Sequence, residues 1–413
     1  QLQLPTTDLL SAALRKLLKA MGGNAQADRL RLWAIDEEHA YRGIGVHPDD
    51  KRFSVVAMKE PGTERVAFFV MTGHAFGWSS AVYNFNRRAR LKQEILRKEF
   101  WLPCFAYYDD LFGIETAETI QTAEKCARRM HELLGILYGE HKVHVGAVLS
   151  ILGVGYDLPR LRLAITDKRK IALTAEIKHI LSVDSLSPGA AGKLKGKLTF
   201  AAGQLWGRKG RHLMPALSHR QYRRKSTAKS HSDRLDSALQ RSLREWQKIL
   251  RTGKTRQIMA YASGRNDVTL FTDGWVPDKR KGETAPRGLC GRIGAVLFHK
   301  SLPKPLCFAF DVPESWAWAW QERDTQIILV ELIAPLLASY TWRMFLKGRS
   351  TILFNDSTTA ESILIKGYSN QALDANKITA EYHDDSCEQE TCVYIERCPT
   401  DCNPSDGCSR GKI

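Results

Sequence analysis

The sequence predicts a multidomain α+β protein. Apolar, strand-like runs that end in acidic residues occur in two separate parts of the chain, before residue 160 and after residue 260. Between them lies a basic segment whose apolar residues recur at helical spacing. The chain has 413 residues, of which 43% are hydrophobic, so it can form two or three domains with their own cores. We therefore expect an α+β domain at 1–160, a basic helical segment at 161–260 and an α/β domain at 261–413.

The first domain is predicted to bring three carboxylates together. Residues 30–35 form a short apolar strand that ends in Asp36, and residues 37–42 after it can form a helix. Asp109 and Asp110 lie between two apolar runs, as at the tip of a β-hairpin. Paired acids are also common in ordinary turns. Carboxylates gathered at one edge could hold paired Mg²⁺ ions for phosphoryl transfer.

Three blocks of this domain follow the order found in retroelement reverse transcriptases, which the chain resembles. The blocks are residues 34–42, residues 76–81 (Phe-Gly-Trp-Ser-Ser-Ala) and the Tyr-Tyr-Asp-Asp box at 107–110. The resemblance implies a right-hand palm in which Asp36 and Asp109 bind metal and Asp110 is a less directly coordinating neighbour. It also implies four residues that contact the nucleotide, with the first stacked beneath the incoming sugar: Tyr41, Phe76, Gly77 and Tyr107.

Two weaker blocks come next in the family's order. Residues 133–142 resemble a helix and lysine that assist departure of pyrophosphate, which implies this role for Lys142. Residues 151–156 resemble a hairpin that grips the primer end. The alternatives are a surface lysine and an ordinary glycine-containing strand, and only the sequential order favours the functional interpretation.

The basic charge of the chain is concentrated in one segment. Lys193 to Arg256 contains 18 Lys and Arg against three acids, a local charge of +15 where the whole chain has +16. Such a segment can follow a nucleic-acid phosphate backbone, although solvated faces and linkers often have the same composition. Nucleic acid is therefore the favoured partner.

Part of this basic segment is predicted to be helical. Leu194, Leu198, Ala201 and Leu205 are spaced by four, three and four residues, which indicates one buried helix face. Residues 196–217 resemble the connection of tyrosine-recombinase-type retrotransposons. Residues 218–232 are polar and basic without apolar periodicity, which predicts a domain boundary or an exposed loop.

Strands and a helix that carry acids recur in the third segment. The elements expected, in chain order, are strands at 268–274, 293–298 and 305–312, a helix at 325–345, and strands at 351–355 and 393–397. The acids that these elements carry or precede are Asp273, Glu331, Asp356 and Asp406. Each has an ordinary alternative, such as a turn for Asp273, a solvent-facing position for Glu331 or a helix cap for Asp356.

This ordered set of acids resembles that of ribonuclease H. The resemblance implies that Asp273, Glu331, Asp356 and Asp406 bind two Mg²⁺ ions, or Mn²⁺, and hydrolyse RNA paired to DNA. The sequence departs from the family at 369–390, which is polar and acidic where an apolar helix is usual. This departure leaves the packing of the last helix undetermined by the sequence.

A second departure lies at the N-terminus. Only 35 residues precede Asp36, so we expect incomplete fingers, and the chain is expected to be part of a longer polyprotein. The expected activity is RNA-directed DNA polymerisation with ribonuclease H hydrolysis, and the expected partners are an RNA template, a DNA primer, an RNA–DNA hybrid and deoxynucleoside triphosphates. The alternatives are an inactive nucleic-acid-binding remnant of a decayed element and a chain that has ribonuclease H activity only.

Other classes of protein are disfavoured. Five cysteines between Cys387 and Cys408 lack the paired spacing of a zinc site. Nine cysteines without a signal peptide indicate free thiols in a reducing compartment, so we expect an intracellular protein, cytoplasmic or nuclear and not secreted. Residues 327–346 are long enough to cross a membrane, but Glu331, Pro335 and Arg343 favour a buried helix with a catalytic acid.

Overall fold

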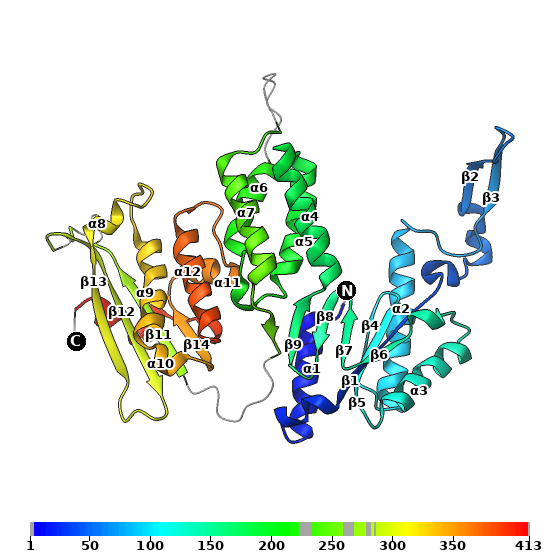
Figure 1. Cartoon of the computed structure of the whole chain (residues 1–413), viewed down its shortest axis with the longest axis horizontal. Helices are drawn as coiled ribbons and strands as arrows, with labels where there is room; N and C mark the ends of the chain where they lie inside the picture. The colour runs from blue at the N-terminus through cyan, green and yellow to red at the C-terminus, as the bar shows by residue number, and fades with distance from the viewer. Residues whose placement is uncertain (1–3, 223–232, 259–267, 278–281, 285, 412–413) are drawn as a thin grey trace. The chain divides into compact units, whose positions relative to one another are not determined.

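The chain folds into a mixture of helices and strands, in agreement with the predicted α+β class (Figure 1). The computed structural model describes residues 4–222, 233–258, 268–277, 282–284 and 286–411. Two compact units are present: unit 1 comprises Gln1–Thr166 with Gln257–Ala262, and unit 2 comprises Asp167–Arg256 with Ser263–Ile413. The three segments expected from the sequence thus fall in two units, because the basic helical segment belongs to the same unit as the C-terminal domain.

A four-stranded antiparallel sheet forms the centre of unit 1. Its strand order is β4-β5-β1-β6, with bounds β1 (Leu30–Asp36), β4 (Cys104–Tyr107), β5 (Asp110–Thr116) and β6 (His144–Gly146). Side chains alternate across a strand, so Leu30 and Leu32 enter one core while Trp33 and Ile35 enter another. Both faces of β1 are therefore buried, which explains its nearly continuous apolar run.

Three helices cover this sheet. Their bounds are α1 (Thr7–Ala20), α2 (Ser79–Glu99) and α3 (Ile120–Leu133). Leu10, Leu14 and Leu18 of α1 are buried at a spacing of four and pack on the Leu30 face. Helices α2 and α3 supply buried residues to the Trp33 face. Residues 37–42 form no α-helix, and only the short 3₁₀ turn η2 (Ala40–Gly43) occurs there.

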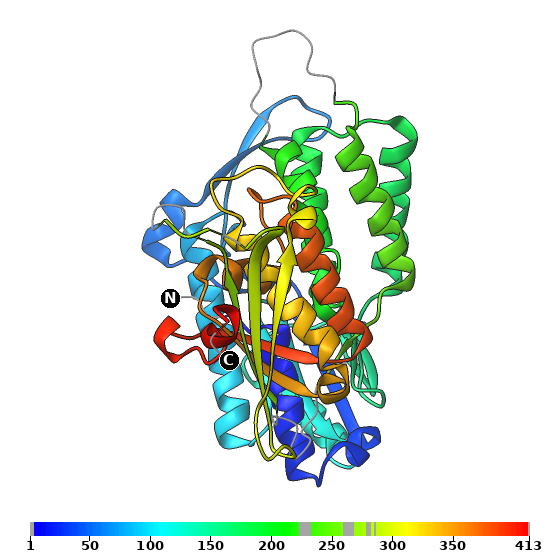
Figure 2. The same cartoon turned by 90° about the vertical axis from the view of Figure 1, so that its left-hand side faces the viewer.

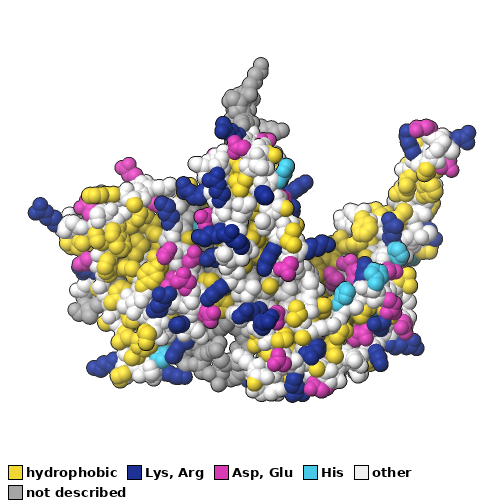
Figure 3. All heavy atoms as spheres, viewed as in Figure 1, with side chains coloured by type: hydrophobic (Ala, Val, Ile, Leu, Met, Phe, Trp, Pro, Cys, Tyr) yellow, Lys and Arg dark blue, Asp and Glu magenta, His cyan; other side chains and the backbone are white. Residues whose placement is uncertain are grey.

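Two smaller sheets complete unit 1. The first has the strand order β10-β9-β8-β7, with bounds β7 (Val148–Ile151), β8 (Val154–Asp157), β9 (Arg162–Ile165) and β10 (Arg256–Gln257), of which Gln257 belongs to unit 1. The hairpin expected at 151–156 is present, with Leu152 and Gly153 at positive φ in its turn. The second is a two-stranded hairpin of β2 (Val55–Lys59) and β3 (Val66–Val70) that projects from the unit and exposes hydrophobic side chains (Figures 1 and 3).

Unit 2 begins with four helices. Their bounds are α4 (Asp167–Val183), α5 (Pro188–Ala202), α6 (Met214–Gln221) and α7 (Ser237–Thr252). Leu194, Leu198 and Ala201 are buried on α5 as predicted, and Leu205 is buried beyond the end of the helix. Lys and Arg side chains gather on the visible face of these helices (Figure 3). Of the boundary or loop predicted at 218–232, residues 218–221 belong to α6 and 223–232 lie outside the described residues.

A five-stranded mixed sheet forms the rest of unit 2. Its order is β13-β12-β11-β14-β15, with bounds β11 (Val268–Trp275), β12 (Leu289–His299), β13 (Leu306–Pro313), β14 (Ser350–Asn355) and β15 (Cys392–Arg397). Strands β11, β12 and β13 are antiparallel neighbours, whereas β14 and β15 run parallel to β11. The five strands expected from the sequence are all present near their predicted positions.

Helices lie on both faces of this sheet. Their bounds are α8 (Glu314–Ala317), α9 (Ile327–Thr341), α10 (Arg343–Leu346), α11 (Thr358–Lys366), α12 (Ala375–Glu388) and α13 (Asp406–Ser409). Figures 1 and 2 show α12 and α13 on opposite faces. The single helix predicted at 325–345 is wrong in detail, because Trp342 separates α9 from α10. Its backbone leaves helical geometry and its indole packs on Phe308 at a ring-centroid distance of 5.1 Å.

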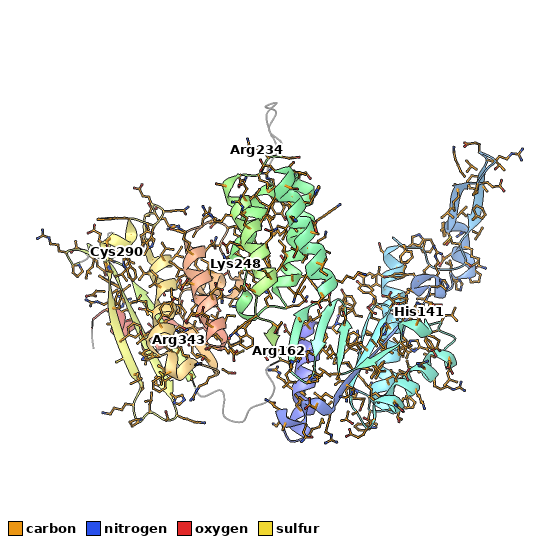
Figure 4. All side chains as sticks on the ribbon, viewed as in Figure 1. His141, Arg162, Arg234, Lys248, Cys290 and Arg343 are labelled. Carbon is orange, nitrogen blue, oxygen red and sulfur yellow. The ribbon has the colours of Figure 1, made fainter. Side chains whose placement is uncertain are left out.

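The polar stretch 369–390 forms the amphipathic helix α12. Tyr382 enters the same core as α9, and Thr379 and Ser386 are buried with their hydroxyls bonded to carbonyls one turn earlier. Asp385, also buried, accepts a hydrogen bond from Ser339 and pairs at 3.5 Å with Arg343 (labelled in Figure 4). Local hydrogen bonds and an ion pair therefore allow a polar sequence to pack where apolar residues were expected.

Side-chain and backbone contacts join the helical segment of unit 2 to the C-terminal domain. The Arg208 guanidinium donates to the Leu364 carbonyl at 2.8 Å, and Lys209 pairs with Asp384 at 3.2 Å. Gly207 lies so close to α12 that an added Cβ would be 2.7 Å from the His383 carbonyl oxygen. These contacts explain why the basic helices and the five-stranded sheet form one compact unit.

Candidate active sites

The three acids predicted for the first site lie at one end of the central sheet of unit 1. Asp36, the last residue of β1, is directly opposite Asp110, the first residue of β5. The amide of Glu37 donates to the Asp109 carbonyl at 3.2 Å. The β-register thus joins a strand end to a hairpin tip more than 70 residues away in the sequence, and this pairing brings the acids together.

The hairpin tip has an unusual backbone. Tyr107 pairs with Asp110, so Tyr108 and Asp109 form a two-residue turn. Tyr108 has φ of 51°, in the left-handed region that non-glycine residues seldom adopt. Backbone strain of this kind tends to persist where a side chain must be held for function.

A lysine partly neutralises the first site. Lys142 lies in η4 (Glu140–Lys142), next to His141, which is labelled in Figure 4. Its ammonium forms an ion pair with Asp36, and this contact raises the pKa of Lys142. Burial and the charges of Asp109 and Asp36 raise the pKa of Asp110 to about 6, although Lys142 opposes the shift. The predicted lysine is therefore next to the predicted carboxylates.

Aromatic residues flank these acids. Tyr41 in η2 packs on Phe76 with ring centroids 5.2 Å apart and on Phe85 of α2 at 4.9 Å. Burial and the charges of Tyr108 and Asp109 raise the pKa of Tyr41. Tyr41 and Phe76 are thus neighbours, and Tyr41 lies within electrostatic reach of Asp109.

Gly77 occupies a position that requires glycine. Its φ is 96°, a left-handed conformation that strains other residues. Among the described residues, no heavy atom lies within 4 Å of the place that a Cβ would take, so the space beside its backbone is open. This geometry leaves room for close approach by a ligand to the backbone.

Three charged residues behind the first site were not identified from the sequence. Glu37 and Lys92 are buried and form an ion pair, and Arg88 contacts the same carboxylate at 2.5 Å. Arg88 and Lys92 are four residues apart on α2, so one helix face presents both. Only the tertiary structure places this face against Glu37.

In the second site, Asp273, Glu331 and Asp356 come together in unit 2. Each offers one carboxylate oxygen, and these three oxygens lie within 4.8 Å of one another. Asp273 is on β11, and Asp356 directly follows the neighbouring parallel strand β14. Glu331 comes from α9, which approaches β11 closely because Gly274 has no side chain; a Cβ there would be 2.8 Å from the Glu331 amide nitrogen.

Carboxylates outnumber the cations near the second site. Burial raises the pKa of Asp273 to about 7, and the charges of Asp356 and Asp406 add to the shift, whereas the hydrogen bond from Ser409 and the charge of Arg410 oppose it. Burial and the charges of Asp273 and Asp356 raise the pKa of Glu331 well above its ordinary value. One oxygen of Asp356, Oδ1, is buried and has no hydrogen-bond partner among the described residues. Three clustered carboxylates with an unpartnered oxygen fit a hard divalent cation such as Mg²⁺.

Asp406, the predicted fourth acid, lies beside this group but outside it. It begins α13, and its carboxylate accepts from the Arg410 guanidinium at 2.6 Å. Its charge still raises the pKa of Asp273. The structure therefore brings three of the four predicted acids into one metal-compatible group.

Polar residues that were not identified from the sequence orient the triad. Asn355 donates to Glu331 Oε2 at 3.1 Å, and the Ser409 hydroxyl donates to Asp273 Oδ2. Both side chains are buried. Asn355 directly precedes Asp356, which could have suggested a role, whereas Ser409 reaches Asp273 only through the fold.

The cysteines contribute no metal-compatible group in the described part of the chain. All nine thiols are free, and the only group of three or more potential ligands among the described residues is the triad in unit 2. None of the helices that the structure describes has the length and apolar character needed to cross a membrane.

Two comparisons with known proteins give no match. No protein-family model matches the chain, and no curated protein is significantly similar to it.

Proposed function

We propose that the chain is a reverse transcriptase with ribonuclease H activity, in which two carboxylate sites carry out separate phosphoryl-transfer reactions. The observation that carries this proposal is the convergence of Asp273, Glu331 and Asp356 from three elements of unit 2. The order of these elements in the chain resembles that of a ribonuclease H, and two of the acids are carried by, or directly follow, the neighbouring parallel strands β11 and β14.

At the second site, we assign some residues to metal binding and others to orienting the metal-binding carboxylates. Asp273, Glu331 and Asp356 would hold Mg²⁺ or Mn²⁺, with Asp406 close enough to contribute charge. A metal ion held by these residues would activate a water molecule and stabilise the charge that develops on the scissile phosphate. Asn355 and Ser409 fix the carboxylates of Glu331 and Asp273, so the acceptor oxygens remain aimed at a common point.

At the first site Asp36 and Asp109 would hold metal, with Asp110 beside them. Lys142 places a cation next to Asp36, where it can stabilise a departing pyrophosphate. Tyr41 and Phe76 offer aromatic surface to a nucleotide, and Gly77 leaves its backbone accessible. The proposed reaction joins a primer 3′-hydroxyl to a deoxynucleoside triphosphate.

The proposed partners are an RNA template, a DNA primer and their hybrid. The basic helices of unit 2 support this assignment because cations on a nucleic-acid-binding surface neutralise phosphates. Binding should therefore weaken steeply as salt increases.

A ribonuclease H without polymerase activity is the second candidate. Two observations favour it: the first-site acids do not form a group as tight as the triad, and the basic helices belong to the unit that holds the triad. A nucleic-acid-binding remnant without turnover is the third, and it differs from both in having neither activity.

Primer extension on an RNA template and cleavage of an RNA–DNA hybrid separate these candidates. We expect both reactions to require Mg²⁺, with Asp109→Asn abolishing extension alone and Asp273→Asn abolishing cleavage alone. Cleavage without extension in the native chain would favour the second candidate. Salt-sensitive nucleic-acid binding without either reaction would favour the remnant.

A further inference from the structure

One face of α2 contacts the segment that carries Asp36 and Tyr41. Phe85, Arg88 and Lys92 are spaced by three and four residues, so their side chains lie on the same side of the helix. All three contact residues between 37 and 43. This segment directly follows Asp36, so α2 can control where the first-site groups lie.

Lys92 forms the deepest contact of this face. Its side chain is only 1% exposed, and its ammonium pairs with the carboxylate of Glu37. The His131 Nδ1–H donates to the Ala127 carbonyl at 2.8 Å, which leaves Nε2 as an acceptor 3.3 Å from the Lys92 ammonium. The lysine is therefore held between an anion and a neutral imidazole, and neither partner is exposed to solvent.

Arg88 extends the network toward the aromatic residues. Its guanidinium donates to Glu37 at 2.5 Å, to the Ala40 carbonyl at 3.3 Å and to the Gly43 carbonyl at 3.4 Å. It also lies 5.0 Å from the centre of the Phe85 ring, which packs on Tyr41. One arginine thus fixes both ends of the turn that presents Tyr41.

Glu37 links these cations to the metal-binding acids. It follows Asp36 in the chain, and its amide donates to the Asp109 carbonyl at 3.2 Å. Its side chain points into the buried cations, while its backbone joins the end of β1 to the hairpin tip. A shift of Glu37 would therefore move Asp36 relative to Asp109.

We propose that Glu37, Arg88 and Lys92 are positioning residues of the first site, and that their buried charge network sets the placement of Asp36, Asp109 and Tyr41. This inference rests on the proposed polymerase function of that site. The network touches neither nucleotide nor metal in this account and acts only through the backbone and aromatic groups that it holds.

The test compares Glu37→Gln, Lys92→Met and the double variant in steady-state primer extension by the full chain. Lys98→Met is the matched control, because Lys98 is on the same helix but exposed. Each single substitution should lower kcat at least tenfold with less than a threefold change in the KM for nucleotide. The double variant should lose less than the product of the two single effects, because both members of one ion pair are gone.

Hybrid cleavage by unit 2 provides an internal measure of active chain, and hydrogen exchange in α2 reports whether unit 1 is folded. Lys92→Met could unfold unit 1 by leaving the Glu37 charge unpaired. In that case the kcat and KM of the double variant, which has no charge at position 37, provide the test. Multiplicative losses in the single and double variants would overturn the proposal, as would kcat values equal to that of Lys98→Met.

A metal-binding measurement keeps the inference separate from the proposed activity. If the native chain extends no primer, Mn²⁺ binding is measured in the Asp273→Asn background, which leaves the first site as the proposed binding site. Weakening of at least tenfold by Lys92→Met would support positioning. Unchanged binding would overturn the proposal. Tighter binding would also overturn it, because that is the Coulombic result of removing a nearby cation. The absence of Mn²⁺ binding by Asp273→Asn alone would overturn it as well.

Discussion

The two carboxylate sites differ in how their charge is balanced. In unit 1, Lys142 pairs with Asp36, and Arg88 and Lys92 surround Glu37 directly behind the site. In unit 2, Asp273, Glu331 and Asp356 face one another with hydroxyl and amide donors as the hydrogen-bond partners of Asp273 and Glu331.

This difference separates a site that contains its own cations from a site that we propose binds a metal ion. Buried like charges disfavour ionisation, so the triad holds its protons more firmly than isolated acids do. Burial is the largest cause of both shifts, and it raises the pKa of Asp273 to about 7 and that of Asp110, near Lys142, to about 6. The contrast therefore rests on the ion pairs: Lys142 pairs directly with Asp36, whereas Arg410, whose charge lowers the pKa of Asp273, pairs with Asp406.

The largest expected effect is loss of hybrid cleavage in Asp356→Asn. This change removes the carboxylate whose Oδ1 has no hydrogen-bond partner among the described residues. We expect the rate of cleavage to fall about 10²–10³-fold, because a charged group needed in the transition state is lost. Single-turnover cleavage of an RNA–DNA hybrid measures it. Asp401→Asn, an exposed acid of the same unit, is the control, and an equal rate in both variants would contradict the assignment.

The next largest effect is expected from Lys142→Met in unit 1. Removal of the cation beside Asp36 should slow primer extension about 10–100-fold, because charge on the departing pyrophosphate is no longer offset. Rapid-quench extension assays measure the rate. The exposed Lys125→Met should extend at the native rate, and hybrid cleavage should be unaffected in both; a native rate in Lys142→Met would refute the role.

The stability of unit 2 should depend on pH when metal is absent. The folded-state pKa of Asp273 lies at about 7, above its unfolded value, so the folded form takes up protons as pH falls through 7 and becomes more stable. Glu331 is shifted in the same direction. Between pH 5.5 and pH 8 the unfolding free energy of unit 2 should fall in both proteins. The fall should be about 1–3 kcal/mol larger in the native protein than in Glu331→Gln, which has no charge at position 331.

Urea unfolding in EDTA, followed by hydrogen exchange in β11 and β14, measures this difference. Addition of Mg²⁺ at pH 8 should restore stability to the native unit and not to Glu331→Gln. Parallel pH profiles for the two proteins would mean that the triad is not a repulsive cluster.

The smallest expected effect concerns Ser409. Its hydroxyl donates to Asp273 without contacting a substrate in this account, so Ser409→Ala should raise the Mg²⁺ concentration for half-maximal cleavage about tenfold. The maximal rate at saturating Mg²⁺ should change little. The exposed Ser315→Ala is the control, and a loss of maximal rate with unchanged Mg²⁺ dependence would assign Ser409 a different role.

Local patterns were sufficient to predict the strands that carry the acids. The run at 30–35 and the Tyr-Tyr-Asp-Asp tip appear as β1 and a tight hairpin, because apolar strands and turn residues act over short distances. The register that sets Asp36 opposite Asp110 depends on distant strands, and no local pattern specifies it. The same limit applies to Lys92, whose charge predicts exposure but whose tertiary partner Glu37 allows burial.

The C-terminal region shows the same division. Asp273, Glu331 and Asp356 could be predicted because each ends or occupies a recognisable element, yet Ser409 was missed because only the docking of α13 brings it to β11. The break at Trp342 was missed because indole packing on Phe308 overrides a sequence that could continue as a helix. Tertiary contacts, rather than local propensity, therefore decide the details on which the chemistry depends.

Mn²⁺ binding measured by electron paramagnetic resonance tests the contrast between the two sites most directly. The native chain should show a tighter and a weaker class of binding, since the triad lacks the cation that Lys142 supplies to Asp36. Asp273→Asn should remove the tighter class, and Asp36→Asn should remove only the weaker one. Loss of the tighter class in Asp36→Asn, or its retention in Asp273→Asn, would contradict the account.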